Sequence, residues 1–465
     1  MFARGYVPGR SGQIFIVPER GSFLLARSDS AFYQFMHGSP WDYDTEIPLL
    51  FYGRPFIRKG TFPEVAGLQD VAPTLMTLLR FAVPTTMTGR TLSEAIEAVP
   101  DRPAATVLIV LDGMGAETWE RLGPKLPTLS RLRREGAWFS NAALDYLPTV
   151  TSTGHATVST GTDPRFHGIQ ANTTFDRRTG KQEEPFPGMN PANYSVLTLA
   201  DHWNLATSDG SAIVVQGATP RATVALAGHG ACTSNGRKIV VAMFDEKTAG
   251  WTTNETCFRL PNYLADNSAR RLWETAPIAW MDHKVDNAKA FLRTGFYPSF
   301  QVDALVEMIE GESVGRDSIP DLLLVNFKTP DYVAHLYGPA SREMEEALRV
   351  LDEQIGRLLH SLDDLVGAGR YVIVMTADHG MPPEPMGPND ARQYVEDMVV
   401  TIHERFDSKG KLILDFEDAN HQMYVDGARL DDLQLKLEDV ARFVETLPSI
   451  RFAFTEDEIR AARIR

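Results

Sequence analysis

Three short apolar runs that end in acidic residues constrain the fold of this chain more than any other feature. They read TVLIVLDGMG (106–115), DLLLVNFKTPD (321–331) and RYVIVMTADHG (370–380). Continuous stretches of β-branched residues and leucine are typical of strands covered on both faces, as in a parallel sheet. In such sheets the carboxyl ends of the strands meet at one edge, where ligands bind. We therefore expect the acids that end these runs to lie close together.

Helical patterns lie between the apolar runs. Residues 127–137 begin with a proline and have Gly136 near their end, and residues 341–362 place their apolar side chains on one face. This alternation predicts an α/β fold with a doubly wound, mostly parallel sheet and helices on both faces. Residues 173–310 are rich in Thr, Asn, Gly and Trp and break the alternation, so we interpret them as an inserted cap over the core. Residues 1–465 are expected to form a single domain.

Charge and hydropathy narrow the classes of partner. The 465 residues carry a net charge of −15, which argues against binding to nucleic acid or to an anionic membrane. No apolar run reaches the roughly 18–20 residues of a membrane span, and the first residues lack the pattern of a signal peptide. A cytoplasmic location is therefore expected, with Cys232 and Cys257 unpaired. Neither the charge nor the hydropathy of the sequence predicts an oligomeric state.

The acids and histidines at the strand ends are candidate metal ligands. Asp112 ends the first run, Asp331 and His335 lie four residues apart, and Asp378 and His379 are adjacent. Carboxylate oxygens and imidazole nitrogens are suitable zinc ligands. A single acid at a strand end more often caps a helix or forms a turn. Three such places, two of them with a histidine, make that simpler explanation weak.

A stretch rich in hydroxyl side chains follows the first run. It reads LPTVTSTGHATVSTGTDPRFHGIQAN (147–172). In the simpler interpretation these hydroxyls cap a helix. In the alternative, one of them is a nucleophile at a helix start, where backbone N–H groups favour an anion and a metal ion activates the hydroxyl.

This stretch resembles the Thr-nucleophile branch of the alkaline-phosphatase superfamily. The branch includes nucleotide pyrophosphatase/phosphodiesterases and Thr-type alkaline phosphatases. Its motif is Thr-x-x-(Gly/Asn)-His, then Thr-Gly, then His-Gly-(Ile/Met) and a following Asn. The matching residues are Thr151, Gly154-His155, Thr160-Gly161, His167-Gly168-Ile169 and Asn172. The resemblance implies that Thr151 is the covalent nucleophile, that Asn172 donates to a phosphoryl oxygen, and that the two motif histidines are structural.

The resemblance also implies two divalent metal ions, which we expect to be zinc. The ligands implied for one ion are Asp112, Thr151, Asp378 and His379. The other ion would be held by Asp331, His335 and a third histidine, which in the family lies downstream of the Asp-His pair. Here His403 and His421 follow that pair, and neither has the His-Gly context of the family motif.

The missing motif lies instead near the start of the chain. His37 opens HGSPWDYDTEIPLLFYG (37–53), and the segments 6–18 and 68–84 resemble those that flank the motif in Thr-type phosphatases. We interpret the chain as circularly permuted, with residues 1–98 corresponding to the family's C-terminal part. The alternative is that residues 1–98 form an unrelated domain with His37 at its surface. That would leave the second ion with two protein ligands, below the three typical of catalytic zinc.

The segment TPRATVALAGH (219–229) bears on the substrate. Arg221 and His229 match the Lys-x-Arg and Gly-His elements of the resembling phosphatases, but Thr219 replaces the lysine. Phosphomonoesters carry more negative charge than diesters and call for more positive charge in the site. We expect a small-molecule phosphate ester as substrate and a phosphomonoesterase as the function. A type I phosphodiesterase/nucleotide pyrophosphatase and a catalytically inactive ligand-binding relative remain the alternatives.

Overall fold

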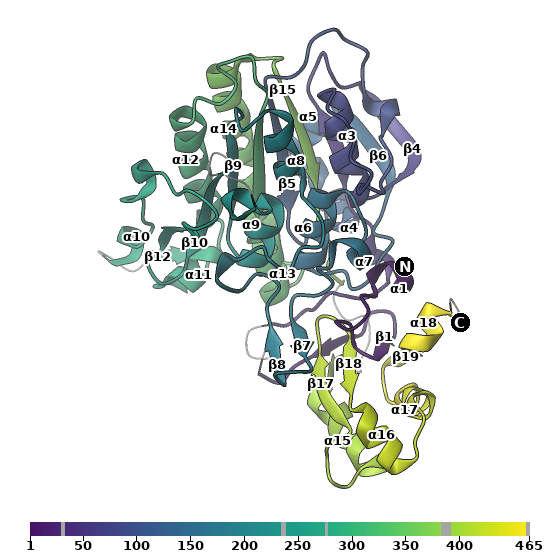
Figure 1. The fold of residues 1–465 in the computed structure, drawn as a ribbon. Coiled ribbons are helices and arrows are strands. Elements are labelled where there is room, and N and C mark those ends of the chain that lie inside the picture. Colours follow the sequence, from purple (N-terminus) through teal and green to yellow (C-terminus); the bar gives the residue numbers. More distant parts are fainter. Residues whose placement is uncertain (29–32, 234–238, 275–277, 383–391, 462–465) are drawn as a thin grey trace.

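The computed structural model describes residues 1–28, 33–233, 239–274, 278–382 and 392–461. They form a large α/β body and a smaller lobe, which contains the C-terminal part of the chain (Figure 1). None of the helices in these ranges is long and apolar enough to cross a membrane.

A nine-stranded sheet forms the centre of the body, in the order β11-β10-β9-β14-β5-β15-β3-β6-β4. Of these nine strands, β11 and β3 run antiparallel to their neighbours and the other pairings are parallel. The expectation of a mostly parallel sheet is confirmed. The strands are β3 (Leu49–Tyr52), β4 (Gly60–Ala66), β5 (Ala105–Leu111), β6 (Ala137–Ala142), β9 (Ile213–Gly217), β10 (Val240–Asp245), β11 (Gly250–Thr252), β14 (Asp321–Phe327) and β15 (Tyr371–Thr376).

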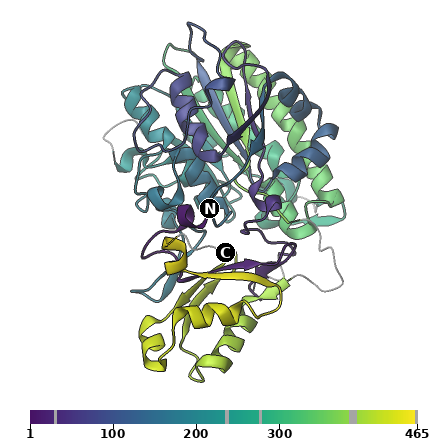
Figure 2. The same ribbon diagram turned by 90° about the vertical axis from the view of Figure 1, so that its right-hand side faces the viewer.

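Helices cover both sides of this sheet (Figure 2). One group packs around α6, and another packs around α14, the long helix expected at residues 341–362. The first group is α3 (Val71–Leu78), α6 (Thr151–Thr160), α7 (Pro164–His167), α8 (Leu199–Ala206) and α9 (Pro220–Ala227). The second group is α5 (Pro127–Glu135), α12 (Phe296–Gly311), α13 (Thr329–Tyr337) and α14 (Arg342–Leu362).

Part of the expected cap belongs to the sheet. Within residues 173–310, β9, β10 and β11 extend the central sheet beyond β14. The runs IVVQG and VVAMFD are short and mostly apolar; the first is buried throughout and the second at all but Met243 and Asp245. The hairpins β7–β8 and β12–β13 lie outside the sheet. The strands of these hairpins are β7 (Thr174–Asp176), β8 (Lys181–Glu183), β12 (Ile278–Trp280) and β13 (His283–Val285).

The smaller lobe has a hydrophobic core of its own. An antiparallel sheet in the order β17-β18-β1-β19 packs against helices, so the structure has a second core where one domain was expected. The N-terminal strand β1 lies between β18 and β19, and the lobe therefore combines both ends of the chain. Its elements are β1 (Ile14–Pro18), β17 (Ile413–Glu417), β18 (Gln422–Val425), β19 (Ile450–Thr455), α15 (Val395–Phe406), α16 (Gly427–Leu433) and α17 (Leu437–Val444).

Short elements complete the structure. They are α1 (Phe2–Gly5), α2 (Asp42–Thr45), α4 (Ala116–Leu122), α10 (Arg271–Glu274), α11 (Ala288–Leu292), α18 (Glu456–Arg460), β2 (Phe23–Leu25), β16 (Arg392–Tyr394), η1 (Leu68–Asp70), η2 (Ser93–Ala95), η3 (Gly123–Lys125), η4 (Pro187–Met189), η5 (Gly230–Cys232), η6 (Asn262–Leu264) and η7 (Asp363–Gly367).

The helices nearest the two ends of the described chain, α1 and α18, lie side by side (Figures 1 and 2). Arg460 on α18 donates a hydrogen bond of 2.6 Å to the hydroxyl of Tyr6, which follows α1. Phe2, Tyr6, Phe454 and Ile459 share one buried cluster. The segments around α1 and α18 are therefore packed against each other.

Cys232 and Cys257 form a disulfide, with Cα atoms 4.6 Å apart. The expectation that they are unpaired was wrong. The chain folds back between them, and the Ala231 N–H donates to the Cys257 carbonyl at 2.8 Å. Their spacing in the sequence contains no signal of this pairing.

Candidate active site

The acids at the ends of the apolar runs meet at one edge of the sheet. Asp112 follows β5, Asp331 lies in the first turn of α13 after β14, and Asp378 follows β15. The approach is close enough to require glycine: a Cβ atom on Gly154 would lie 2.6 Å from Cβ of Asp378. Gly113 has φ +69°, and a Cβ atom there would lie 2.9 Å from Cα of Asp331. Glycines at these two positions let three chain segments converge.

A first cluster joins His37, Asp331 and His335. The Nε2 atom of His335 lies 3.2 Å from Oδ1 of Asp331, and Nε2 of His37 lies 3.6 Å from the same oxygen. All three residues are buried. Ligands about 2.0–2.1 Å from a tetrahedral zinc ion lie ~3.3 Å apart, so this spacing suits a cation between them. The structure thus brings the N-terminal His37 to the place where a third ligand was expected.

A second cluster lies beside the first and contains the four residues Asp112, Thr151, Asp378 and His379. Nε2 of His379 is 3.4 Å from Thr151 Oγ1, 3.4 Å from Asp378 Oδ2 and 3.7 Å from Asp112 Oδ1. Thr151 is the first residue of α6. The hydroxyl expected to be the nucleophile therefore faces the second cluster at a helix start.

Three imidazole rings are oriented by backbone carbonyls. In each ring, Nδ1 donates to a carbonyl oxygen. His37 donates to Thr149 at 2.8 Å, His335 donates to Phe35 at 2.6 Å, and His379 donates to Gly380 at 2.9 Å. Because a carbonyl only accepts, each Nδ1 carries the proton and each Nε2 presents a lone pair to the clusters. This arrangement is typical of histidine metal ligands.

His155 is used differently. Its Nδ1 donates to the Thr151 carbonyl at 2.9 Å, and its Nε2 accepts from Asn326 at 2.9 Å. Nδ1 also lies 3.2 Å from Asp378 Oδ2. With both ring nitrogens engaged, His155 has the geometry of a structural residue. The other motif histidine, His167, contacts Thr157 Oγ1 at 3.1 Å and lies in neither cluster.

Both clusters have unsatisfied oxygens. Within the described residues, Asp331 Oδ1 and Asp378 Oδ2 are buried without a hydrogen-bond partner. Buried carboxylate oxygens of this kind are costly unless a cation pairs with them. Burial, and after it the neighbouring His379 and His335, lower the pKa of His37 well below its ordinary value, which keeps the ring neutral and able to bind a metal. The donor sets fit two divalent cations.

Lys328 is a residue of the site that the sequence interpretation missed. It separates β14 from α13, and its ammonium lies 2.7 Å from Asp112 Oδ1, 2.7 Å from Asp331 Oδ2 and 3.0 Å from Thr151 Oγ1. Burial alone would lower the pKa of Lys328, but the charges of Asp112 and Asp331 raise it, so the side chain stays charged. The signal in the sequence was a lysine placed directly after a buried strand.

Asn172 is held by two contacts. Its Oδ1 accepts from the Ser152 N–H at 3.0 Å, at the start of α6. Its own N–H donates to Asn420 Oδ1 at 3.2 Å, and Asn420 Nδ2 donates to Thr173 O at 2.8 Å. Asn420 precedes β18, so the smaller lobe contributes to the position of Asn172. This contact was not predicted from the sequence.

Arg221 lies at the start of α9, on the wall of a cavity of about 350 Å³ that Tyr33 and Tyr332 also line. The ring of Tyr33 lies 4.7 Å from that of His335, so the cavity adjoins the first cluster. The Nε atom of Arg221 has no hydrogen-bond partner among the described residues. His229 lies apart from both clusters and pairs with Asp201 at 2.9 Å.

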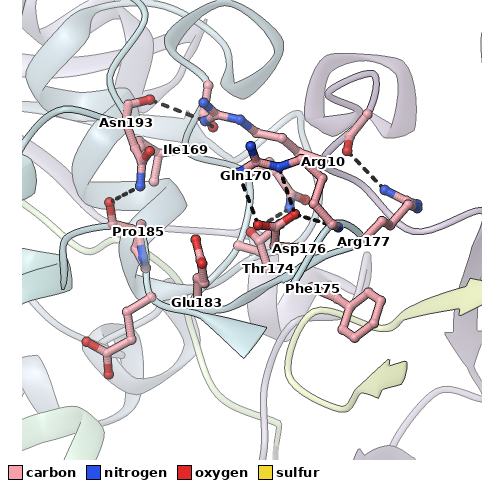
Figure 3. Close-up of a pocket in the computed structure, with 15 residues that line it drawn as sticks. Arg10, Ile169, Gln170, Thr174, Phe175, Asp176, Arg177, Glu183, Pro185 and Asn193 are labelled. Atoms are coloured by element: carbon pink, nitrogen blue, oxygen red, sulfur yellow. Dashed lines mark hydrogen bonds and ion pairs between the residues drawn. The ribbon is translucent and has the colours of Figure 1, made fainter. Parts of the chain in front are cut away.

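A second cavity, of about 340 Å³, lies between the N-terminal segment and the loop after His167 (Figure 3). Its arginines bind protein groups: Arg10 donates to Gly168 O at 2.7 Å and Arg177 to Gly9 O at 2.9 Å. Because these guanidinium groups are already paired, we assign the cavity no catalytic role. The contacts attach residues 9–13 to the loop that carries Asn172.

The two downstream histidines lie outside the clusters. His403 on α15 accepts from the Ile413 N–H at 3.1 Å within the smaller lobe. His421 is buried, and neither of its ring nitrogens has a hydrogen-bond partner among the described residues. Its Nε2 would lie 3.4 Å from a Cβ atom on Gly38, beside the turn that carries His37.

Two carboxylate–imidazole clusters around a helix-start threonine, at the edge of a doubly wound sheet, define a two-metal hydrolase. Comparison with known proteins agrees with this class. Residues 106–457 match the family described as type I phosphodiesterase / nucleotide pyrophosphatase, and the chain belongs to that family. The family is metal-dependent, and its members are phosphoric ester hydrolases.

Individual relatives include both phosphatases and phosphodiesterases. Alkaline phosphatase PafA of Elizabethkingia meningoseptica is 27% identical over 431 residues, which cover 80% of this chain and 79% of the relative. Human ectonucleotide pyrophosphatase/phosphodiesterase family member 1 is 23% identical over 276 residues, or 59% of this chain and 23% of the relative. The crystal structure of wild-type PafA superposes with a TM-score of 0.66 at 25% identity, covering 79% of this chain and 81% of that one.

Proposed function

We propose that this enzyme is a phosphomonoesterase that acts through a phosphothreonine at Thr151, with two zinc ions at the clusters. One observation carries the proposal. The hydroxyl of Thr151 lies 3.4 Å from His379 and 3.0 Å from Lys328, beside the cluster that contains Asp112 and Asp378. Imidazole, carboxylate and ammonium groups around a buried hydroxyl support its assignment as an activated nucleophile.

The reaction would proceed in two displacements. In the first, Thr151 Oγ forms a bond to phosphorus while the ester bond breaks and the alcohol leaves with a proton. In the second, water attacks the phosphothreonine, releases inorganic phosphate and restores the hydroxyl. When bound, the two cations would supply positive charge to the attacking and leaving oxygens.

The residues of the chain have separate roles in this scheme. Asn172 is oriented by the Ser152 N–H through its Oδ1, which leaves its Nδ2 as a donor for a phosphoryl oxygen. The Nε atom of Arg221 has no hydrogen-bond partner in the described part of the chain, and the guanidinium interacts electrostatically with Asp331 and Asp112. We assign it to the charged oxygens of the phosphoryl group, with the leaving group in the adjoining cavity.

The positive charge of Arg221 and of the two expected metal ions supports a preference for monoesters, as does the similarity to alkaline phosphatases. Its test is kcat/KM for an aryl phosphate monoester and the matching diester, with added zinc. We expect the wild-type enzyme to prefer the monoester. Arg221→Ala should lower monoester kcat/KM at least tenfold more than diester kcat/KM. The reason is that a monoester has a third non-bridging oxygen, and the variant loses charge-assisted hydrogen bonds to it.

Arg316→Ala, at an exposed position, is the control and should leave both rates unchanged. A wild-type preference for the diester would replace this proposal with a phosphodiesterase, the activity after which the family is described. The replacement of a lysine of the resembling phosphatases by Thr219 would then explain the preference for the diester.

A further inference from the structure

Lys328 is the one ammonium group that contacts both clusters among the described residues. Its side chain is 1% exposed and lies within 3.0 Å of Asp112, Thr151 and Asp331. Its Nζ also lies 5.5 Å from the ring centre of Tyr332. A buried lysine with three oxygen partners holds a fixed positive charge beside the attacking hydroxyl.

In the first cluster, the lysine contacts a different carboxylate oxygen from the one that faces the histidines. It binds Oδ2 of Asp331, whereas His37 and His335 face Oδ1 of that residue. The two oxygens without a hydrogen-bond partner in the described structure, Asp331 Oδ1 and Asp378 Oδ2, are not among its contacts. The ammonium therefore leaves the facing oxygen of the first cluster open, whereas in the second cluster it shares Asp112 Oδ1 and Thr151 Oγ1 and does not contact Asp378 Oδ2.

We propose that Lys328 is a further catalytic residue, a third cation that acts together with the two metal ions and stabilises negative charge on Thr151 Oγ and on the phosphoryl group. This inference rests on the proposed function. Lys328 keeps its proton throughout and acts by charge and by hydrogen bonding, in a site from which water is largely excluded. Since a monoester brings one more negative charge than a diester, removal of this cation should affect monoesters more.

The position of Lys328 also bears on the departure at Thr219. Thr219 supplies no charge to the cavity wall that holds Arg221. A lysine from the end of β14 would supply the second cation from another element of the fold. Arg221 and Lys328 would then act on the same phosphoryl group from two sides.

The test compares Lys328→Met, Lys328→Gln and Lys328→Arg with the wild-type enzyme. The measurements are bound zinc per chain, the inhibition constant of inorganic phosphate, and kcat/KM on the paired aryl monoester and diester. We expect the Met and Gln variants to keep two zinc ions and to bind phosphate about tenfold or more weakly. Monoester kcat/KM should fall roughly 10²–10³-fold, and diester kcat/KM should fall less. Lys328→Arg should recover part of the loss.

Lys59→Met, at an exposed position, is the matched control. One zinc per chain in the wild type and two in Lys328→Met would overturn the inference, because the lysine would then replace an ion. Unchanged phosphate binding and equal losses on both esters would also overturn it. A wild-type preference for diesters refutes the proposed function separately, while the comparison of phosphate binding between wild type and variants still decides the role of Lys328.

Discussion

The imidazole rings of His37 and His379 stack, with centroids 3.6 Å apart and planes inclined by 19°. His379 follows β15 in the middle of the sheet, whereas His37 precedes β3 near the start of the chain. The contact exists because β3 pairs with β15 inside the central sheet. The N-terminal segment is thus part of the site and of the core.

The first prediction concerns the metal ligand His37. His37→Ala should lower bound zinc from two ions to about one per chain and reduce activity by several orders of magnitude, because the first cluster would keep only Asp331 and His335. Zinc is measured by mass spectrometry after dialysis. The control is His421→Asn, since His421 has φ +56° and asparagine tolerates that conformation. Loss of zinc in the control but not in His37→Ala would exclude His37 as a ligand.

The second prediction concerns the order of the segments. We infer that residues 1–98 occupy the place of the family's C-terminal part, which is supported by the contact between Arg460 and Tyr6. A chain that begins at residue 99, with residues 1–98 joined behind residue 465 by a flexible linker, should fold and retain activity. Its new ends fall at Ala98, which is exposed, and Val99, which is half-buried, next to the exposed residues 100–102.

The control for this rearrangement is the chain of residues 99–465 alone. It should bind less zinc and unfold at lower temperature, because it lacks both β3 and His37. If the rearranged chain is as impaired as this truncated one, the inference of a permuted order fails.

The third prediction identifies the nucleophile. Thr151→Ala should largely retain both metal ions and lose turnover by several orders of magnitude. The reason is that the variant loses the hydroxyl that lies 3.4 Å from His379 Nε2. Ser152→Ala and Thr153→Ala are the controls, because their hydroxyls are buried without hydrogen-bond partners among the described residues. Near wild-type activity in Thr151→Ala would move the assignment to one of these two.

The fourth prediction concerns the dependence of stability on pH. Burial raises the pKa of Asp44 from 3.8 to about 8, against the opposing hydrogen bonds from Ser39. The folded carboxyl therefore keeps a proton that the unfolded chain has released. The folded state binds more protons between these values, so the free energy of unfolding falls as the pH rises from about 4 to about 8.

Asp44→Asn should remove this contribution, which amounts to at most ~1.4 kcal/mol per pH unit. Denaturant unfolding at several pH values measures it, with the exposed Asp101→Asn as control. The difference in unfolding free energy between Asp44→Asn and the wild type should grow towards pH 8. A difference that stays constant with pH would contradict the assignment.

The fifth prediction concerns the disulfide. Cys232 and Cys257 are 25 residues apart, and the loop they close is expected to stabilise the fold by about 3 kcal/mol. Reduction should therefore lower the temperature of unfolding. The double variant Cys232→Ser, Cys257→Ser should match the reduced protein and show no response to reductant.

If reduction leaves the stability of the wild type unchanged, the bond does not form in solution. A disulfide that forms stably is typical of oxidising compartments. The cytoplasmic location expected from the sequence stays a prediction, and a stable bond would argue against it.

The strand ends were predictable because their signals are local. The apolar runs before Asp112 and Asp378 identify buried parallel strands from residue type alone, and their carboxyl ends must meet at one edge. The expected helices at residues 127–137 and 341–362 are observed as α5 and α14 for the same reason. The motif from Thr151 to Asn172 is contiguous, so its helix start could be read directly.

Contacts between segments that are distant in the sequence were not predictable in this way. The pairing of β1 with β19, the contact of Asn420 with Asn172 and the disulfide join segments whose local patterns carry no information about each other. Residues 173–310 were assigned to a cap because they are rich in Thr, Asn, Gly and Trp and break the alternation, yet β9 pairs with β14, and β10 and β11 follow β9 in the sheet.

By itself, then, the sequence determined the strands, the helix start at Thr151 and the types of ligand available, because each depends on neighbouring residues. Only the tertiary structure decided that the ammonium of Lys328 lies between two carboxylates and that a carbonyl orients each ligand histidine. Such relationships depend on which strand ends become neighbours, and long-range pairing of backbone and side chains determines the order of the strands in the sheet.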